Sequence, residues 1–196
     1  MTIVYIHGAS ATSESFTHIR EHIPLSDLAI NYDSNNGFAN NLRDMKERLD
    51  NVEKIFFVAH SLGGIYALHL ADYFKHKTLG GVTISTPYGG SKEADFALYF
   101  LPFSRLMRDI GPTSAPMAHV KDLKFPTDKW TNIVTTVGKS PWINEPNDGV
   151  VTLESMRHIS SMELVELPLN HYEVVISNQT VDIIKERIKR TPLGPH

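Results

Sequence analysis

The sequence predicts an α/β fold with a doubly wound, mostly parallel sheet of six strands and helices on both faces. Three observations predict it. Short apolar segments rich in β-branched and aromatic residues alternate along the chain with segments of helical pattern. Several apolar segments are continuous, which is typical of parallel strands that helices cover on both faces. The length of 196 residues suits one domain with one hydrophobic core.

The predicted strands comprise residues 3–6, 28–32, 54–59, 81–85, 132–137 and 163–167. The predicted helices comprise residues 13–22, 39–49, 62–74 and 179–189. In the last helix, Val181, Ile184 and Ile188 form an apolar stripe, as expected of a helix with one buried face. Because strand and helix alternate, we expect the strand order 2-1-3-4-5-6, in which the first and third strands are neighbours.

One stretch after the fourth strand breaks this rhythm. Residues 91–128 hold four of the eleven prolines. They also carry an aromatic cluster of Phe96, Tyr99, Phe100 and Phe103. We expect a mostly helical insertion in a single domain of residues 1–190, followed by a flexible tail, 191–196. Two interpretations of the insertion stay open: a lid or wall at a substrate pocket, and a packed cap without a moving part.

Composition and charge exclude several classes of function. The formal net charge is −3 and the sequence pI is near 6.3, without a basic run, so we expect no nucleic-acid partner. The chain has no cysteine, which excludes disulfides, thiolate metal sites and a cysteine nucleophile. No apolar run reaches the ~20 residues of a membrane span. Residues 1–6 lack a secretory signal pattern. We therefore expect a cytoplasmic protein, whose oligomeric state the sequence leaves open.

A candidate nucleophile stands between a strand and a helix. Ser61 directly follows a strand of buried type, with Ala59 two residues before it and Gly63 two residues after it. This is the pattern of a nucleophile elbow, whose sharp turn needs small residues at both positions. Glycine is the usual residue at both, and Ala59 differs from it by one methyl group. The alternative is that Ser61 only caps the following helix.

A second feature follows the first strand, where the chain reads His7-Gly8-Ala9. Gly8 allows the backbone to approach a ligand closely. We expect the amide of Ala9 to join that of Leu62, the residue after Ser61, in an oxyanion hole. Alone, a His-Gly pair at a strand end indicates an ordinary turn. Its coincidence with the elbow favours the functional interpretation, with His7 and His60 at the substrate pocket.

Two later loops supply candidates for the acid and the base. Asp148 lies in an Asn-Asp-Gly turn after the fifth strand, and His171 follows the sixth strand. With Ser61 they have the chain order Ser, Asp, His of this kind of hydrolase. The chemistry needs an imidazole to take the serine proton and a carboxylate to orient that imidazole. Each residue has a simpler alternative, a turn aspartate or a loop histidine. The reserve candidates for the acid are Glu145, Glu154 and Asp128.

We expect the remaining histidines to be surface or packing residues. The main ones are His18, His22, His69, His76, His119 and His158. The sequence has no His-Glu-x-x-His motif, and we expect neither a metal site nor a cofactor.

Five segments carry a resemblance that covers nearly the whole chain. They are residues 7–9, 59–64, 86–90, 147–151 and 170–173. On these segments the sequence resembles the α/β-hydrolase superfamily, and more narrowly the small bacterial lipases and esterases, a group that includes glycolipid-anchor deacylases. The resemblance implies hydrolysis of a carboxylic ester. It also implies that the chain begins at the family's third strand, as in the smallest lipases.

We therefore expect a serine esterase or lipase that forms an acyl-enzyme on Ser61 and acts on a small-molecule ester or lipid-like substrate. Tyr88 and aromatic residues of the segment 91–125 are expected to line the acyl pocket. The same three residues also serve acyltransferases, thioesterases and amidases. A hydrolase fold can also bind a ligand without turnover. These alternatives stay open, as do the acyl chain length and the alcohol of the substrate.

Overall fold

The structure, a computed structural model, describes residues 1–90, 111, 114–123, 127–141 and 143–192. Within these residues six strands pair in one sheet in the order β2-β1-β3-β4-β5-β6, and every neighbouring pair is parallel. This confirms the predicted fold class and strand order. The strands are β1 Thr2–Ile6, β2 Asp27–Ile30, β3 Ile55–His60, β4 Thr78–Ile84, β5 Trp130–Thr135 and β6 Glu163–Leu167.

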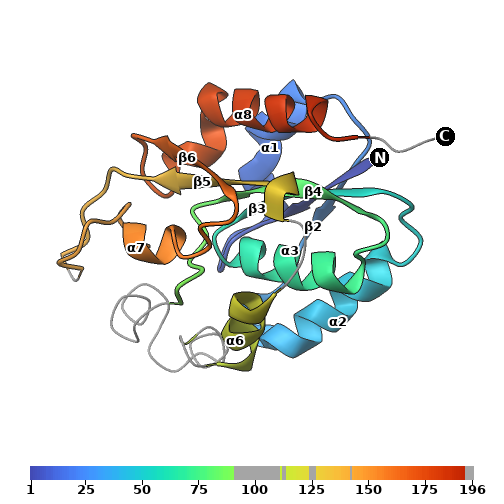
Figure 1. Ribbon diagram of the computed structural model, residues 1–196, viewed down its shortest axis with the longest axis horizontal. Helices are drawn as coiled ribbons and strands as arrows, with labels where there is room; N and C mark the ends of the chain where they lie inside the picture. The colour runs from blue at the N-terminus through green and yellow to red at the C-terminus, as the bar shows by residue number, and fades with distance from the viewer. Residues whose placement is uncertain (91–110, 112–113, 124–126, 142, 193–196) are drawn as a thin grey trace.

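Helices cover both faces of the sheet, with α1 and α8 on one face and α2, α3, α6 and α7 on the other (Figure 1). The helices are α1 Thr17–His22, α2 Phe38–Leu49, α3 Leu62–Tyr73, α6 Ala115–Asp122, α7 Leu153–Met156 and α8 Asn178–Lys189. Short 3-10 helices are η1 Ser13–Phe16, η2 Ser34–Asn36, η3 Thr127–Lys129 and η4 Glu173–Ile176.

Alternation along the central strands divides the core into two layers. Val4 and Ile6 of β1 pack in the layer that contains α2 and α3, whereas Ile3 and Tyr5 pack in the layer of α1 and α8. This is the two-residue period of a strand that is buried on both faces. α3 is buried on most sides because the sheet, α2 and α6 all pack around it. The sheet and α3 therefore form the rigid centre on which the site is built.

Five of the six strands differ from the predicted bounds by one to three residues, and β4 and β5 differ most. β4 begins at Thr78, three residues before the predicted start, so Gly80 and Gly81 both lie inside the strand. A Cβ atom at position 81 would lie 2.7 Å from Trp130 Cζ3 and 2.6 Å from Phe57 O. Because Trp130 pairs with Gly81, β5 begins at residue 130 and ends at Thr135, two residues earlier than predicted.

Part of the predicted insertion is described. α6 packs against α3, and η3 leads into β5 (Figure 1). The predicted aromatic cluster lies in residues 91–110, outside the described residues. At the other end of the chain, Thr191 is buried and donates a hydrogen bond from Oγ1 to Arg187 O at 2.8 Å. Thr191 therefore continues the packing of α8.

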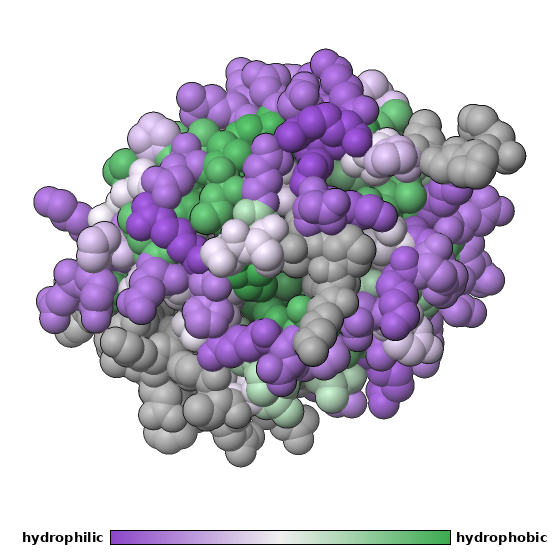
Figure 2. Space-filling model, in the orientation of Figure 1, coloured by the Kyte–Doolittle hydropathy of each residue, from purple (hydrophilic) through white to green (hydrophobic). Residues whose placement is uncertain are grey.

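Polar side chains cover most of the face of the molecule that Figure 2 presents. In the part of the chain that the structure describes, no helix combines the length and apolar character needed to cross a bilayer.

The central strand β3 supplies a test of the core. Phe57 is fully buried, and its ring stacks on Trp130 with 6.0 Å between ring centroids. We expect Phe57→Ala to lower the free energy of unfolding by about 3–5 kcal/mol in urea titrations, since it leaves a large cavity. The control Ile176→Ala removes a side chain that is 63% exposed, and its effect should stay within about 0.5 kcal/mol. Equal losses for the two variants would contradict the assigned core.

Candidate active site

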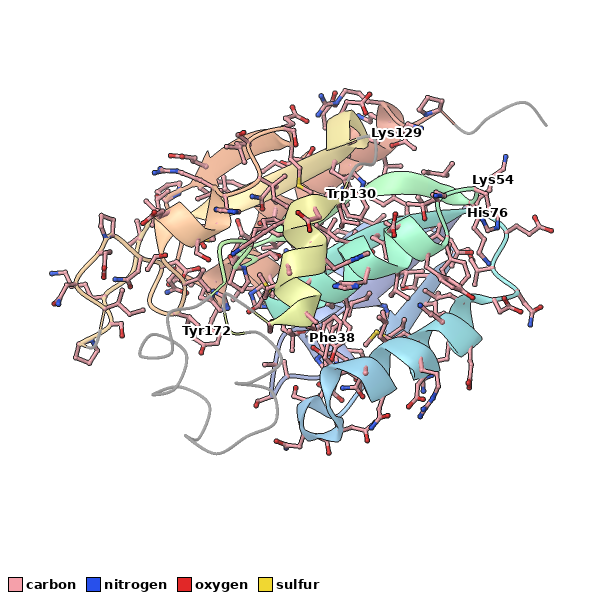
Figure 3. The ribbon with its side chains drawn as sticks, turned by 60° about the horizontal axis from the view of Figure 1, so that its bottom comes forward. Phe38, Lys54, His76, Lys129, Trp130 and Tyr172 are labelled. Atoms are coloured by element: carbon pink, nitrogen blue, oxygen red, sulfur yellow. The ribbon has the colours of Figure 1, made fainter. Side chains whose placement is uncertain are left out.

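The candidate residues follow the carboxyl ends of strands. Ser61 comes directly after β3, Asp148 lies in the loop after β5, and His171 lies in the loop after β6. Figure 3 labels Tyr172, the neighbour of His171, at one end of the molecule. The opposite end carries the labelled residues Lys54, His76 and Lys129, each of which lies just before a strand. Because all strands are parallel, the three loops meet at one edge of the sheet, where such folds bind ligands.

The backbone of Ser61 is strained. Its φ of 53° lies in the left-handed region, which residues other than glycine rarely adopt. Its amide donates to Ile84 O of β4 at 2.8 Å, and α3 begins at the next residue. Such strain costs about 1–3 kcal/mol and persists only where the surroundings hold it. The turn is the sharp strand-to-helix elbow that the sequence predicts.

Two glycines after Ser61 allow α3 to approach the sheet. A Cβ atom at Gly63 would lie 2.1 Å from Ile6 O, and one at Gly64 would lie 2.0 Å from Thr86 Oγ1. Any side chain at either position would collide with its neighbours. The first contact is with backbone of β1, which cannot move without breaking the sheet. The small residues of the motif therefore have a steric reason in this fold.

The carboxylate of Asp148 is buried and has four hydrogen-bond donors. Oδ1 accepts from the amides of Val150 and Val151 at 3.0 and 2.7 Å. Oδ2 accepts from Thr135 Oγ1 at 2.5 Å and from His171 Nδ1 at 2.8 Å. Burial by itself raises the pKa of Asp148, but the hydrogen bonds, that of His171 first, hold the pKa below its ordinary value. The side chain is therefore an ionised acceptor at neutral pH.

His171 is held by both its side chain and its backbone. An ionised carboxylate only accepts hydrogen bonds, so the proton of the imidazole lies on Nδ1, toward Asp148. The amide of His171 also donates to Asp148 O at 3.1 Å. In the neutral ring this leaves Nε2 with a free lone pair. The structure thus brings together two of the three residues predicted for the proton transfer.

His60, the residue before Ser61, links the elbow to the His171 loop. Its Nε2 donates to His171 O at 3.0 Å, and the two rings lie 4.7 Å apart between centroids. Burial, with His171 nearby, lowers the pKa of His60 to about 3, so the ring is neutral. No hydrogen bond joins Ser61 Oγ to His171 in the described residues.

The two amides predicted for the oxyanion hole are unused by the described part of the chain. In the turn after β1, the amide of Ser10 donates to Ser34 Oγ and that of Ala11 to Gly8 O. Among the described residues, no atom accepts a hydrogen bond from the amides of Ala9 and Leu62. Leu62 is the first residue of α3, where amides lack partners within the helix. A Cβ atom at Gly8 would lie 3.1 Å from Ser61 Cβ, so this turn is next to the elbow.

The three residues predicted to contact substrate are buried in this structure. His7 stacks on Tyr32 and accepts the Tyr32 amide at Nε2, and burial lowers its pKa. Tyr88 lies in the core, and its hydroxyl donates to Thr83 Oγ1 at 2.7 Å. His60 donates a hydrogen bond to His171 O. We therefore assign packing and loop-holding contacts to these side chains.

The reserve carboxylates do not replace Asp148. Glu145, Glu154 and Asp128 are all exposed, and His171 Nδ1 has Asp148 as its partner. Sequence reasoning missed two hydroxyl groups near that carboxylate, those of Ser85 and Thr135. A signal for them was present in the sequence. Both are polar residues at the carboxyl ends of the fourth and fifth strands, which are neighbours in the predicted strand order.

Four of the remaining histidines form two pairs on helix surfaces. His18 and His22 lie four residues apart in α1 with ring centroids 4.4 Å apart, and His69 stacks on His119 between α3 and α6. His69 also bonds to Pro116 O at 3.0 Å. Within the described residues, no group of three or more metal-ligating side chains occurs.

Comparisons with known proteins were made by sequence and by structure. No protein-family model and no curated protein matches the sequence. The mature form of a Bacillus licheniformis lipase matches the structure with a TM-score of 0.68 and 18% identity, over 94% of this chain and 90% of that chain. A metagenomic carboxyl esterase matches with a TM-score of 0.71 and 16% identity, over 97% and 74%. A Legionella pneumophila phospholipase matches with a TM-score of 0.74 and 12% identity, over 97% of this chain and 64% of that chain. At these identities the likeness shows a shared fold.

The low pKa of His60 has a consequence for stability. In the unfolded chain the ring titrates near its ordinary 6.5, whereas in the folded protein it titrates near 3. Between these values the unfolded state binds one more proton, so His60 lowers the free energy of unfolding as the pH falls, by up to about 1.4 kcal/mol per unit. We expect the free energy of unfolding, measured by urea titration, to fall less in His60→Gln than in wild type between about pH 6.5 and about pH 4.5. His76→Gln, at an exposed position, serves as the matched control. If the free energy of unfolding falls equally with pH in wild type and in His60→Gln, this assignment is wrong.

Proposed function

We propose that this protein, which has the α/β-hydrolase fold, is a serine hydrolase that cleaves carboxylic esters through an acyl-enzyme on Ser61. The observation that carries the proposal is the buried hydrogen bond of 2.8 Å between His171 Nδ1 and Asp148 Oδ2. This bond leaves Nε2 of His171 as the basic nitrogen. It occurs beside an elbow with a strained serine, and that combination is the working unit of serine hydrolases.

In the proposed acylation step, His171 Nε2 takes the proton of Ser61 while Oγ attacks the ester carbonyl carbon. The carbonyl oxygen becomes an oxyanion, and the amides of Ala9 and Leu62 are the donors proposed to stabilise it. The imidazolium then gives its proton to the departing alcohol. Asp148 stays ionised and stabilises the positive ring throughout.

Deacylation repeats the step with water. His171 takes a proton from a water molecule, the hydroxide attacks the acyl carbon, and the proton returns to Ser61 Oγ as the carboxylic acid leaves. The neutral His60 does not compete for these protons, because its pKa is far below the working range. Its contact with His171 O keeps the base loop next to the elbow.

An ester is the substrate class that we propose. The solved structures with the same fold include a lipase, a carboxyl esterase and a phospholipase, all named for ester hydrolysis. We propose that aromatic residues of the segment 91–125, which follows β4 in the chain, contribute to the acyl pocket. We also propose that a small-molecule ester or a lipid-like ester is the substrate.

The direct test is Ser61→Ala, assayed on p-nitrophenyl esters of increasing chain length. We expect kcat to fall by at least about 10³-fold with folding retained, because the nucleophile is lost while the rest of the site stays. Ser26→Ala, at an exposed position before β2, is the matched control and should keep the wild-type rate. Hydrolysis by Ser61→Ala at the wild-type rate would end the proposal.

A further inference from the structure

Two hydroxyl groups connect the sheet to the Asp148 carboxylate. Ser85 directly follows β4 and Thr135 ends β5, and both are fully buried. Ser85 Oγ lies 2.8 Å from Thr135 Oγ1, which in turn lies 2.5 Å from Asp148 Oδ2. The amide of Ser85 also donates to Ile133 O at 2.9 Å, which fixes Ser85 against β5.

The direction of the Ser85–Thr135 and Thr135–Asp148 hydrogen bonds follows from which groups have a proton to donate. An ionised carboxylate has no proton to give, so Thr135 donates its only proton to Asp148 Oδ2. Thr135 Oγ1 can then only accept from Ser85, and Ser85 is the donor. The other neighbour of Thr135 Oγ1 is Met156 Sδ at 3.5 Å, a much weaker acceptor than a carboxylate. The chain therefore runs from Ser85 to Thr135 to Asp148.

Thr135 differs from the other donors to Asp148. The amides of Val150 and Val151 belong to the loop of Asp148 itself and hold Oδ1. Among the residues that the structure describes, only Thr135 joins the carboxylate to the sheet, and it does so at Oδ2, the same oxygen that binds His171. The sheet is also what holds the elbow, because Ser61 donates its amide to Ile84 O, one residue before Ser85.

We propose that Thr135, oriented by Ser85, is a positioning residue that holds Asp148 Oδ2 in place for His171 and so sets the geometry of the base relative to Ser61. The inference rests on the proposed function. Ser85 has a φ of 51° and is therefore strained, as Ser61 is, and its bond to Thr135 is one of the contacts that hold it there. The titratable group that interacts with both Asp148 and His171 is His60, and burial lowers the pKa of His60 to about 3.

The experiment compares four variants. Thr135→Val keeps the shape and removes the hydroxyl, whereas Thr135→Ser keeps the hydroxyl. Ser85→Gly removes the first donor, and glycine suits the positive φ. Thr136→Val makes the same change one residue further on, where Oγ1 donates to Leu167 O at 3.2 Å, away from Asp148. Thermal unfolding is recorded for each variant.

The first measurement is ester hydrolysis. We expect Thr135→Val to lower kcat about tenfold or more with KM changed less than about twofold, because loss of a supporting hydrogen bond misplaces the base without touching substrate. Ser85→Gly should show a smaller loss of kcat. Thr135→Ser should restore at least half of the wild-type kcat, and Thr136→Val should match wild type. An unchanged kcat in Thr135→Val, or equal losses in Thr135→Ser and Thr135→Val, overturns the proposal.

The second measurement does not need activity. The hydrogen bond of Thr135 is one of the contacts that lower the pKa of Asp148, so a ¹³C NMR titration of this carboxyl should give a higher pKa in Thr135→Val. The pKa should rise less in Ser85→Gly and stay unchanged in Thr135→Ser. If wild type hydrolyses no ester, the proposed function fails, while this titration still decides the donor chain. If the pKa of Asp148 in Thr135→Val equals that of wild type, the donor chain is wrong. If Thr135→Val does not fold, the same comparison is made between Ser85→Gly and wild type.

Discussion

The buried carboxylate of Asp148 is the group on which the arrangement of the site depends. A buried charge of this kind is tolerated only with a full set of partners, and Asp148 accepts from two amides, one hydroxyl and one imidazole. Those four donors come from its own loop, from the end of β5 and from the loop after β6. Satisfying one carboxylate therefore brings three segments together, and it fixes which nitrogen of His171 carries the proton.

The sheet supplies the other constraint, which is the position of the elbow. The strand order places β1 and β4 on either side of β3, so the turn after β1 and the end of β4 both flank Ser61. Gly63 and Gly64 allow α3 to pack within contact of Ile6 and Thr86, where any Cβ atom would collide. The strained backbone of Ser61 is held by this packing and by its bond to Ile84. Sheet order, close packing and strain thus act on the same residue, which we propose as the nucleophile.

The sequence was sufficient for the fold class, the strand order and the pairing of Asp148 with His171, because each follows from local pattern and chain order. It could not give the hydroxyl contacts of Ser85 and Thr135, which depend on the register between β4 and β5. The bond of His60 to His171 O joins residues 111 positions apart and leaves no local signal. The burial of Tyr88 in the core also depends on tertiary packing, and a single aromatic residue in the sequence does not indicate it.

The most direct test of the account is a crystal structure of the protein after reaction with a p-nitrophenyl alkylphosphonate, whose adduct imitates the tetrahedral intermediate. We expect phosphorus bonded to Ser61 Oγ, one phosphoryl oxygen within about 3.2 Å of the amides of Ala9 and Leu62, and His171 Nε2 facing the adduct. An unmodified Ser61, or an adduct whose phosphoryl oxygen points away from both amides, would contradict it.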